Sequence, residues 1–155
     1  VMVQLACERP EKLEAKSVLG ALRPRFPLSL AVIEDDDADF QTITLLLKQA
    51  SLLDAKTIRF RNVDEFLKTS DGTFHVILLD RFIQRAGISE DRIREIKALH
   101  PDAGVIMYTS SDCPSLRSNA VQEGAMAVVE KGSLSPSEFE LLLMTAGCLG
   151  AKVSN

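Results

Sequence analysis

Acidic, hydroxyl and amine side chains stand at the ends of four apolar segments of this chain. They are Glu34, Asp35, Asp36 and Asp37 after the first segment, Asp80 after the third, Thr109 after the fourth and Lys131 after the fifth. Each has an ordinary interpretation when taken alone. An acidic run is usually a solvated turn before a helix, and a single Thr or Lys in a loop usually has no special function. Their meaning therefore depends on whether the fold brings them together.

Together, these residue types would form a site for phosphoryl chemistry. Carboxylates a few ångströms apart repel one another and raise each other's pKa. A hard divalent cation relieves the repulsion, and oxygen ligands with several waters suit Mg²⁺. One carboxylate, Asp80, can then attack a phosphoryl group and form an acyl phosphate. Lys131 would neutralise charge on the transferring group, and the hydroxyl of Thr109 would donate a hydrogen bond to one of its oxygens.

The elements that must position these residues alternate between strand and helix patterns. We expect strands at 28–33, 57–60, 74–79, 104–108 and 126–129, and helices at 38–53, 63–67, 89–99, 114–123 and from 135 onward. Apolar strands separated by helices indicate a parallel sheet that is covered on both faces. The expected fold is α/β, a flavodoxin-like doubly wound sheet of five βα units. In such sheets the functional site lies beyond the carboxyl ends of the strands, where the polar residues stand.

Local signals mark several helix ends. Asn62 and Ser89 are the expected N-terminal caps of the second and third helices, and Gly124 is expected to end the fourth. Ser135 and Glu138 have the spacing of a capping box, with proline at the first helical position between them.

With its motifs in this order, the chain resembles bacterial two-component response-regulator receiver domains over about residues 28–147. That family has an acidic pair after the first strand, an acceptor Asp after the third, Thr or Ser after the fourth and Lys after the fifth. The resemblance implies that Asp80 accepts a phosphoryl group from a sensor histidine kinase or a histidine phosphotransfer protein, assisted by Thr109 and Lys131. It implies a cytoplasmic switch in a phosphorelay that uses Mg²⁺ or Mn²⁺ and is not a turnover enzyme.

Two registers are open for the acidic pair. In the family, the first apolar residue of the next helix typically lies five places after the first acid, and Phe40 then selects Asp35 and Asp36 as metal ligands. This is the favoured register. The alternative uses Glu34 with Asp35 and requires one inserted residue. Asp35 is common to both.

Three positions depart from the family's pattern. After the acceptor the family usually has Met-Pro, whereas this chain has Arg81-Phe82. The backbone carbonyl of Phe82 is still an expected metal ligand, together with Asp80. Val128 stands where the family often has an aromatic residue, and Gly132 follows the lysine where proline is usual. The usual coupling between the hydroxyl residue and that aromatic ring is therefore not available.

Two other functions remain as alternatives. A pseudo-receiver would keep the fold as a protein-interaction module without phosphorylation, and the atypical residues after Asp80 favour it. A haloacid-dehalogenase-like phosphatase also combines Asp, Thr or Ser, Lys and Mg²⁺. Its nucleophile motif carries a second Asp two residues on, where this chain has Phe82, so this alternative is the weaker one.

The length and composition of the chain limit the classes of protein to which it can belong. The 155 residues suffice for one domain with short extensions, and a net charge of −4 gives no general attraction to nucleic acid. No apolar run approaches the roughly 20 residues of a membrane span. Three scattered cysteines fit a reduced cytosol better than a disulfide framework.

The expected organisation is an N-terminal extension at 1–27, the receiver-like domain at 28–147 and a C-terminal tail at 148–155. The extension contains one amphipathic helix, which could form a homodimer, dock on the domain or link to an upstream segment. The resemblance places contact with an output partner on residues 114–147. The chain is expected to be a stand-alone regulator or a fragment of a larger one.

Overall fold

The computed structural model describes residues 27–50, 52, 54–68, 73–83, 87–110 and 113–150. The helix expected within the N-terminal extension lies outside these residues. At the other end of the domain, the last helix continues to Gly150, past the boundary expected at 147.

One parallel sheet forms the centre of the molecule. Its strands are β1 (Ser29–Ile33), β2 (Lys56–Phe60), β3 (Val76–Leu79), β6 (Gly104–Thr109) and β7 (Ala127–Glu130). They lie in the order β2-β1-β3-β6-β7, and every neighbouring pair is parallel. The predicted flavodoxin-like doubly wound sheet is confirmed.

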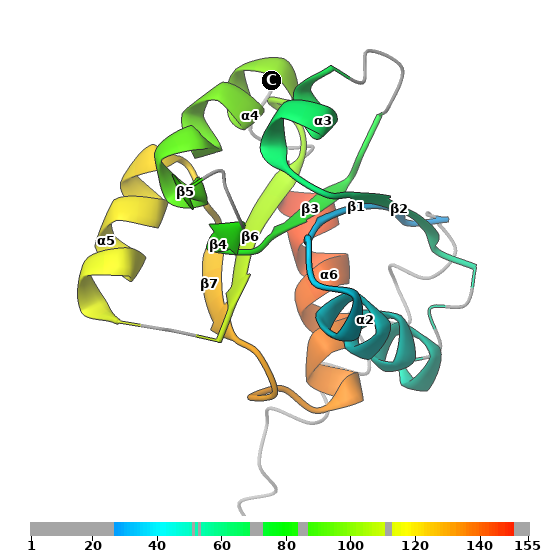
Figure 1. Ribbon diagram of the computed structural model, residues 1–155. Helices are drawn as coiled ribbons and strands as arrows, with labels where there is room; N and C mark the ends of the chain where they lie inside the picture. The colour runs from blue at the N-terminus through cyan, green and yellow to red at the C-terminus, as the bar shows by residue number, and fades with distance from the viewer. Residues whose placement is uncertain are drawn as a thin grey trace, which may run out of the picture.

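Helices cover both faces of this sheet (Figure 1). Helices α2 (Asp37–Gln49) and α6 (Pro136–Gly150) pack on one face, and α3 (Val63–Leu67), α4 (Ile93–Leu99) and α5 (Pro114–Glu123) on the other. None of the helices in the described part of the chain is both long and apolar enough to cross a membrane.

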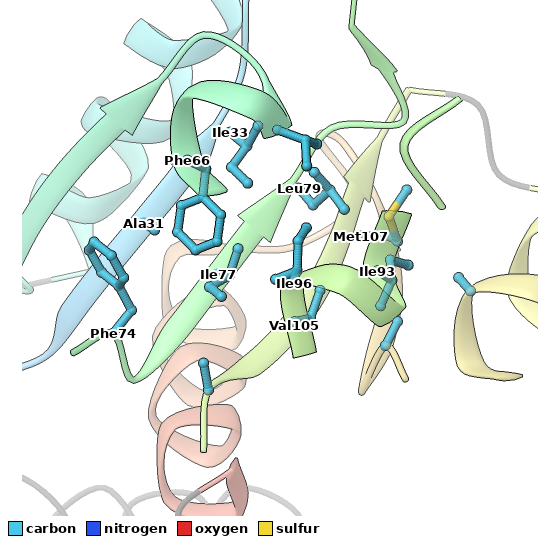
Figure 2. Packing of buried hydrophobic residues seen from close by; sticks show 14 of the residues in the cluster. Ala31, Ile33, Phe66, Phe74, Ile77, Leu79, Ile93, Ile96, Val105 and Met107 are labelled. Carbon is cyan, nitrogen blue, oxygen red and sulfur yellow. The ribbon is translucent and has the colours of Figure 1, made fainter. Parts of the chain in front are cut away.

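Alternate residues of the strands divide the core into two clusters, as the pleat requires. On β1, Ala31 and Ile33 face α3, α4 and α5, whereas Leu30 and Val32 face α2 and α6. Figure 2 shows part of the first cluster, in which strand side chains pack against Phe66 of α3 and against α4. Burial on both faces explains why the three central strands β1, β3 and β6 are mostly apolar.

Most of the predicted helix ends are confirmed. The side chain of Asn62 accepts a hydrogen bond from the amide of Glu65, and Gly124 ends α5 with a left-handed φ of 114°. In the capping box before α6, the amide of Ser135 donates to the carboxylate of Glu138, and the amide of Glu138 donates to the hydroxyl of Ser135.

The segment after β3 differs from the expectation. A small antiparallel hairpin, β4 (Phe82–Ile83) with β5 (Gly87–Ile88), separates Asp80 from the next helix. The helix expected over 89–99 is a 3₁₀ turn, η2 (Ser89–Arg92), followed by α4. Ser89 is not a helix cap, since its hydroxyl donates instead to the carbonyl oxygens of Asp80 and Arg81. That bonding closes the base of the hairpin.

Candidate functional site

Backbone hydrogen bonds bring the predicted residues to one edge of the sheet. The amide of Asp80 donates to the carbonyl of Ile33 at 3.0 Å, which places Asp80 beside the end of β1. The amide of Lys131 donates to the carbonyl of Thr109 at 2.8 Å, which aligns the ends of β6 and β7. Asp80 and Lys131 directly follow β3 and β7, and Thr109 is the last residue of β6.

Three carboxylates meet at this edge. Glu34, Asp35 and Asp80 each offer an oxygen, and these oxygens all lie within 4.8 Å of one another. Glu34 and Asp80 are buried, at 1% and 9% exposure. Burial raises the pKa of Asp80 above its ordinary value; the nearby Lys131 acts in the opposite direction, and the charge of Asp35 adds to the increase. Burial likewise raises the pKa of Glu34, although bonds from Lys131 and the amide of Asp36 oppose it.

Lys131 bonds to three acids at once. Its Nζ lies 2.8 Å from Glu34 Oε2, 2.6 Å from Asp39 Oδ2 and 3.2 Å from Asp80 Oδ1. Burial by itself lowers the pKa of this ammonium, but the hydrogen bonds to Asp39 and Glu34, together with the charges of Asp80 and Glu34, hold the pKa above its ordinary value. Lys131 is therefore a fixed positive charge beside the carboxyl group of Asp80.

Asp39 was not among the residues singled out from the sequence. It lies in the first turn of α2, where an acid is normally interpreted as a partner of the helix dipole. The only signal in the sequence was the continuation of the acidic run into the helix. Nothing in that pattern indicates a lysine 92 positions further along the chain.

The structure also bears on the register of the acidic pair. Asp36 is exposed, and its carboxylate caps α2 by accepting the amide of Asp39 at 2.9 Å. Its own amide donates to Glu34 Oε1 at 3.0 Å. Of the favoured pair, Asp35 therefore lies in the carboxylate cluster and Asp36 lies outside it. Glu34, the residue of the alternative register, lies in the cluster instead.

Thr109 and Phe82 are the remaining predicted residues of the site. Thr109 is fully buried at the end of β6. For Phe82 only the backbone is relevant. The amide of Ser89 donates to the carbonyl of Arg81, so these two residues form a hydrogen-bonded pair. Hydrogen-bonded and non-hydrogen-bonded pairs alternate along an antiparallel ladder, and the next pair, Phe82 with Ile88, is therefore non-hydrogen-bonded. This alternation leaves the Phe82 carbonyl outside the hairpin ladder, where it can serve as a ligand.

The two atypical positions downstream have ordinary structural places. Val128 is buried in the cluster beneath α3, α4 and α5. Gly132 has a φ of 82°, which a side chain would disfavour, so glycine permits the turn after Lys131.

The donor set fits a hard divalent cation. Glu34, Asp35 and Asp80 supply carboxylate oxygens, and the carbonyl of Phe82 can supply another oxygen. Oxygen-only donor sets of this kind suit Mg²⁺, Mn²⁺ or Ca²⁺ rather than softer metals. Electrostatics also favour a cation here. The pKa values of Glu34 and Asp80 are raised because the ammonium of Lys131 does not fully compensate for the burial of these carboxyl groups.

Comparisons with solved structures return receiver domains. One similar structure is a CheY-like response regulator receiver domain from Methanospirillum hungatei, with a TM-score of 0.69, 16% identity, and coverage of 82% of this chain and 98% of that chain. Another is a response regulator from Burkholderia pseudomallei that carries a phosphorylated aspartic acid and a calcium ion. Its TM-score is 0.64 at 21% identity, with coverage of 82% of this chain and 73% of that chain.

A third is the receiver domain of a sensor histidine kinase from Pseudomonas aeruginosa, with a magnesium ion in its active site cleft. It has a TM-score of 0.65, 16% identity, and coverage of 78% of this chain and 98% of that chain. No protein-family model and no curated protein sequence matches the chain. At these identities the comparisons establish the fold, which is that of response-regulator receiver domains.

Proposed function

We propose that this domain is a phosphorylation switch of the two-component type, in which Asp80 accepts a phosphoryl group from a histidine kinase or a histidine phosphotransfer protein. One observation carries the proposal. A partly buried lysine and a cluster of three carboxylates, one of them the expected acceptor, meet at the carboxyl edge of a receiver-type sheet. The chemistry of this set, and not the overall fold alone, selects phosphoryl transfer.

The residues divide the work of transfer. A carboxylate oxygen of Asp80 attacks the phosphorus, the bond from phosphorus to the donor's imidazole nitrogen breaks, and an acyl phosphate forms. Lys131, already 3.2 Å from Asp80 Oδ1, compensates negative charge on the phosphoryl oxygens. Thr109 supplies a hydroxyl at the same edge. A cation held by Glu34, Asp35, Asp80 and the Phe82 carbonyl would supply further positive charge.

The proposal includes the consequences of transfer. The acyl phosphate biases an existing equilibrium between two conformations of the domain and turns over no substrate pool, so the protein acts as a switch and not as a classical enzyme. Output contact is assigned to residues 114–147, which hold α5, β7 and most of α6. The proposal also allows the domain to form a homodimer. It places the protein in the cytoplasm, together with its kinase partner.

Covalent phosphorylation tests the proposal directly. Wild-type protein is incubated with Mg²⁺ and acetyl phosphate, and its intact mass is measured. We expect one phosphate adduct per chain that requires Mg²⁺ and disappears in Asp80→Asn. Asp102→Asn is the matched control, because Asp102 is an exposed acid before β6, at the opposite edge of the sheet. This control should be phosphorylated like the wild type.

Two outcomes would contradict the proposal. An adduct that persists in Asp80→Asn would place the chemistry on another residue. A wild type that takes up no phosphate would favour the pseudo-receiver alternative, which the hairpin between Asp80 and η2 also favours. Steady turnover of a phosphomonoester would instead support the phosphatase alternative.

A further inference from the structure

Arg59 lies at the end of β2, directly beside the loop that carries two of the three clustered carboxylates. Its Cα is paired with that of Val32 on β1, two residues before Glu34. Its guanidinium carbon lies 4.6 Å from the centre of the Phe40 ring, and only 17% of its side chain is exposed. Stacking on Phe40 fixes the plane of the guanidinium, so the directions of its N–H groups are set.

That guanidinium donates to two residues of the acidic loop and to the first residue of α2. Its Nε donates to the carbonyl of Glu34 at 2.9 Å, and one terminal nitrogen donates to the carbonyl of Asp35 at 3.1 Å. The other terminal nitrogen donates to Asp37 Oδ1 at 2.7 Å. One planar group thus holds two consecutive carbonyl oxygens and the first residue of α2.

The two carbonyls belong to the residues whose side chains enter the carboxylate cluster. Glu34 and Asp35 lie between β1 and α2 and belong to neither. Fixing both peptide planes limits the backbone rotation that would swing these side chains away from Asp80. The same contact compensates part of the negative charge of the loop, as the lowered pKa of Asp37 shows; hydrogen bonds from Arg59 and Arg61 are its main causes.

Arg61 makes a weaker version of the same contact. One of its terminal nitrogens donates to the carbonyl of Asp35 at 3.1 Å and to Asp37 Oδ1 at 2.7 Å. It makes no contact with Glu34 that is comparable to that of Arg59 in the described structure, and 54% of its side chain is exposed. Of the two arginines, Arg59 is therefore the less exposed and makes the more extensive contact with the loop.

We infer that Arg59 is a positioning residue for the divalent-cation site. It acts through the loop backbone, by holding the Glu34 and Asp35 carbonyls so that both carboxylates face Asp80. The inference rests on the cation site of the proposed function and adds to it the residue that shapes the site. Partners that orient metal ligands in this way typically contribute roughly 10- to 100-fold to metal affinity.

The substitution Arg59→Lys separates positioning from charge. Lysine keeps the positive charge beside the loop but cannot reproduce the planar fork. We expect Mn²⁺ to bind roughly 10-fold or more weakly in Arg59→Lys than in the wild type, measured by titration calorimetry on the unphosphorylated full chain. The unfolding curve of each variant is recorded in the same buffer, so that affinity is compared on folded protein.

Arg92→Lys is the matched control. Arg92 also bonds two acids, Asp64 and Glu95, but on the face of the molecule that carries α3 and α4. It should lose some stability and keep wild-type Mn²⁺ affinity. Wild-type affinity in Arg59→Lys would overturn the positioning role, as would an equal loss in Arg92→Lys.

The test also distinguishes failure of this inference from failure of the proposed function. A wild type that binds Mn²⁺ and is phosphorylated on Asp80, with unchanged affinity in Arg59→Lys, refutes only the role of Arg59. A wild type that binds no Mn²⁺ refutes that role as well, whereas the phosphate adduct on Asp80 is measured separately and decides the proposed function.

Discussion

Ser89 shows how a single hydroxyl can hold the backbone at Asp80, the proposed acceptor, without taking part in the proposed chemistry. Its Oγ donates to the carbonyl of Asp80 and lies 3.1 Å from that of Arg81, while its amide donates to Arg81 at 3.0 Å. Ser89 is only 4% exposed, so no bulk water can replace these bonds. The backbone that follows Asp80 is therefore fixed by a residue nine positions later.

Removing that hydroxyl should destabilise the fold. In Ser89→Ala the buried carbonyl of Asp80 loses its side-chain donor, which costs about 1–3 kcal/mol of unfolding free energy. Urea unfolding followed by circular dichroism measures the change. Ser133→Ala is the control, because Ser133 makes a similar bond to the carbonyl of Glu130 on the surface. It should change stability by less than about 0.5 kcal/mol. Equal losses in the two variants would contradict the role given to Ser89.

Some residues of the site could be predicted from the sequence and others could not. Asp80 and Lys131 directly follow strands and Thr109 ends one, and strand ends are visible in the sequence. The acidic register was harder, because the spacing to Phe40 favoured Asp35 with Asp36. The direction in which each acid points depends on contacts between the loop and β2. In these contacts Arg59 of β2 bonds to the carbonyls of Glu34 and Asp35. Such contacts across 24 or 25 positions leave no periodic pattern.

At the scale of elements, β6 and α6 approach each other unusually closely. A Cβ atom on Gly104 would lie 2.6 Å from the backbone carbonyl oxygen of Ala146, nearer than real Cβ contacts allow. Backbone cannot move aside as a flexible side chain can. The packing of α6 on the sheet thus depends on glycine at the first residue of β6.

Gly104→Ala should therefore push α6 away from the sheet. We expect a loss of about 1–3 kcal/mol in unfolding free energy, the usual cost of overpacking a core. Thermal and urea unfolding measure it. A variant as stable as the wild type would show that helix and strand can separate without cost, contrary to the close approach seen here.

A histidine ties two strands together and makes their pairing sensitive to pH. The Nδ1 atom of His75 accepts the amide of Ser29 at 2.9 Å, and its own amide donates to the carbonyl of Ser29 at 2.9 Å. Burial lowers the pKa of His75 below 6.5. Acceptance at Nδ1 requires that this nitrogen carry no proton, so the bond and the lowered pKa agree.

The sign of the pH effect follows from this shift. The unfolded chain takes up a proton near pH 6.5, and the folded chain does so only at lower pH. The unfolding free energy should therefore be highest above that pH and fall as the pH decreases toward the folded-state pKa. In His75→Asn the side-chain oxygen can still accept the bond but does not titrate, so the slope should decrease. Burial also lowers the pKa of His100, so His100 would still contribute to the change of unfolding free energy with pH. A slope that is unchanged in His75→Asn would contradict this account.

At the scale of the whole molecule, the layered fold was predictable and the β4–β5 hairpin was not. Five strand segments, most of them apolar, alternate with helical patterns and leave few arrangements other than a doubly wound parallel sheet. The hairpin has strands of only two residues each, and two-residue strands carry no detectable alternation. Ser89, interpreted as a cap because serine often is one, instead closes that hairpin.

Cation binding should couple the site to the stability of the whole fold. A ligand that binds only the folded state adds RT ln(1 + [L]/Kd), about 2.7 kcal/mol when its concentration is 100 times Kd. We expect Mg²⁺ to raise the unfolding temperature of the wild type in a concentration-dependent way. The carboxylates of Glu34, Asp35 and Asp80 meet only when β1 and β3 are paired, so the unfolded chain has no comparable site.

Two neighbouring substitutions make this a test of the acidic register. Asp35→Asn removes a carboxylate from the cluster, and the Mg²⁺-dependent increase in unfolding temperature should largely disappear. Asp36→Asn removes one negative charge a single residue away, yet asparagine still caps α2, so the increase should remain. Both variants lose one negative charge at or next to the site. A difference between their Mg²⁺-dependent increases in unfolding temperature therefore shows which carboxylate binds the cation, and not a general loss of charge. The reverse result, with the increase lost in Asp36→Asn and kept in Asp35→Asn, would restore Asp36 as a ligand and would require the loop to rearrange when the cation binds.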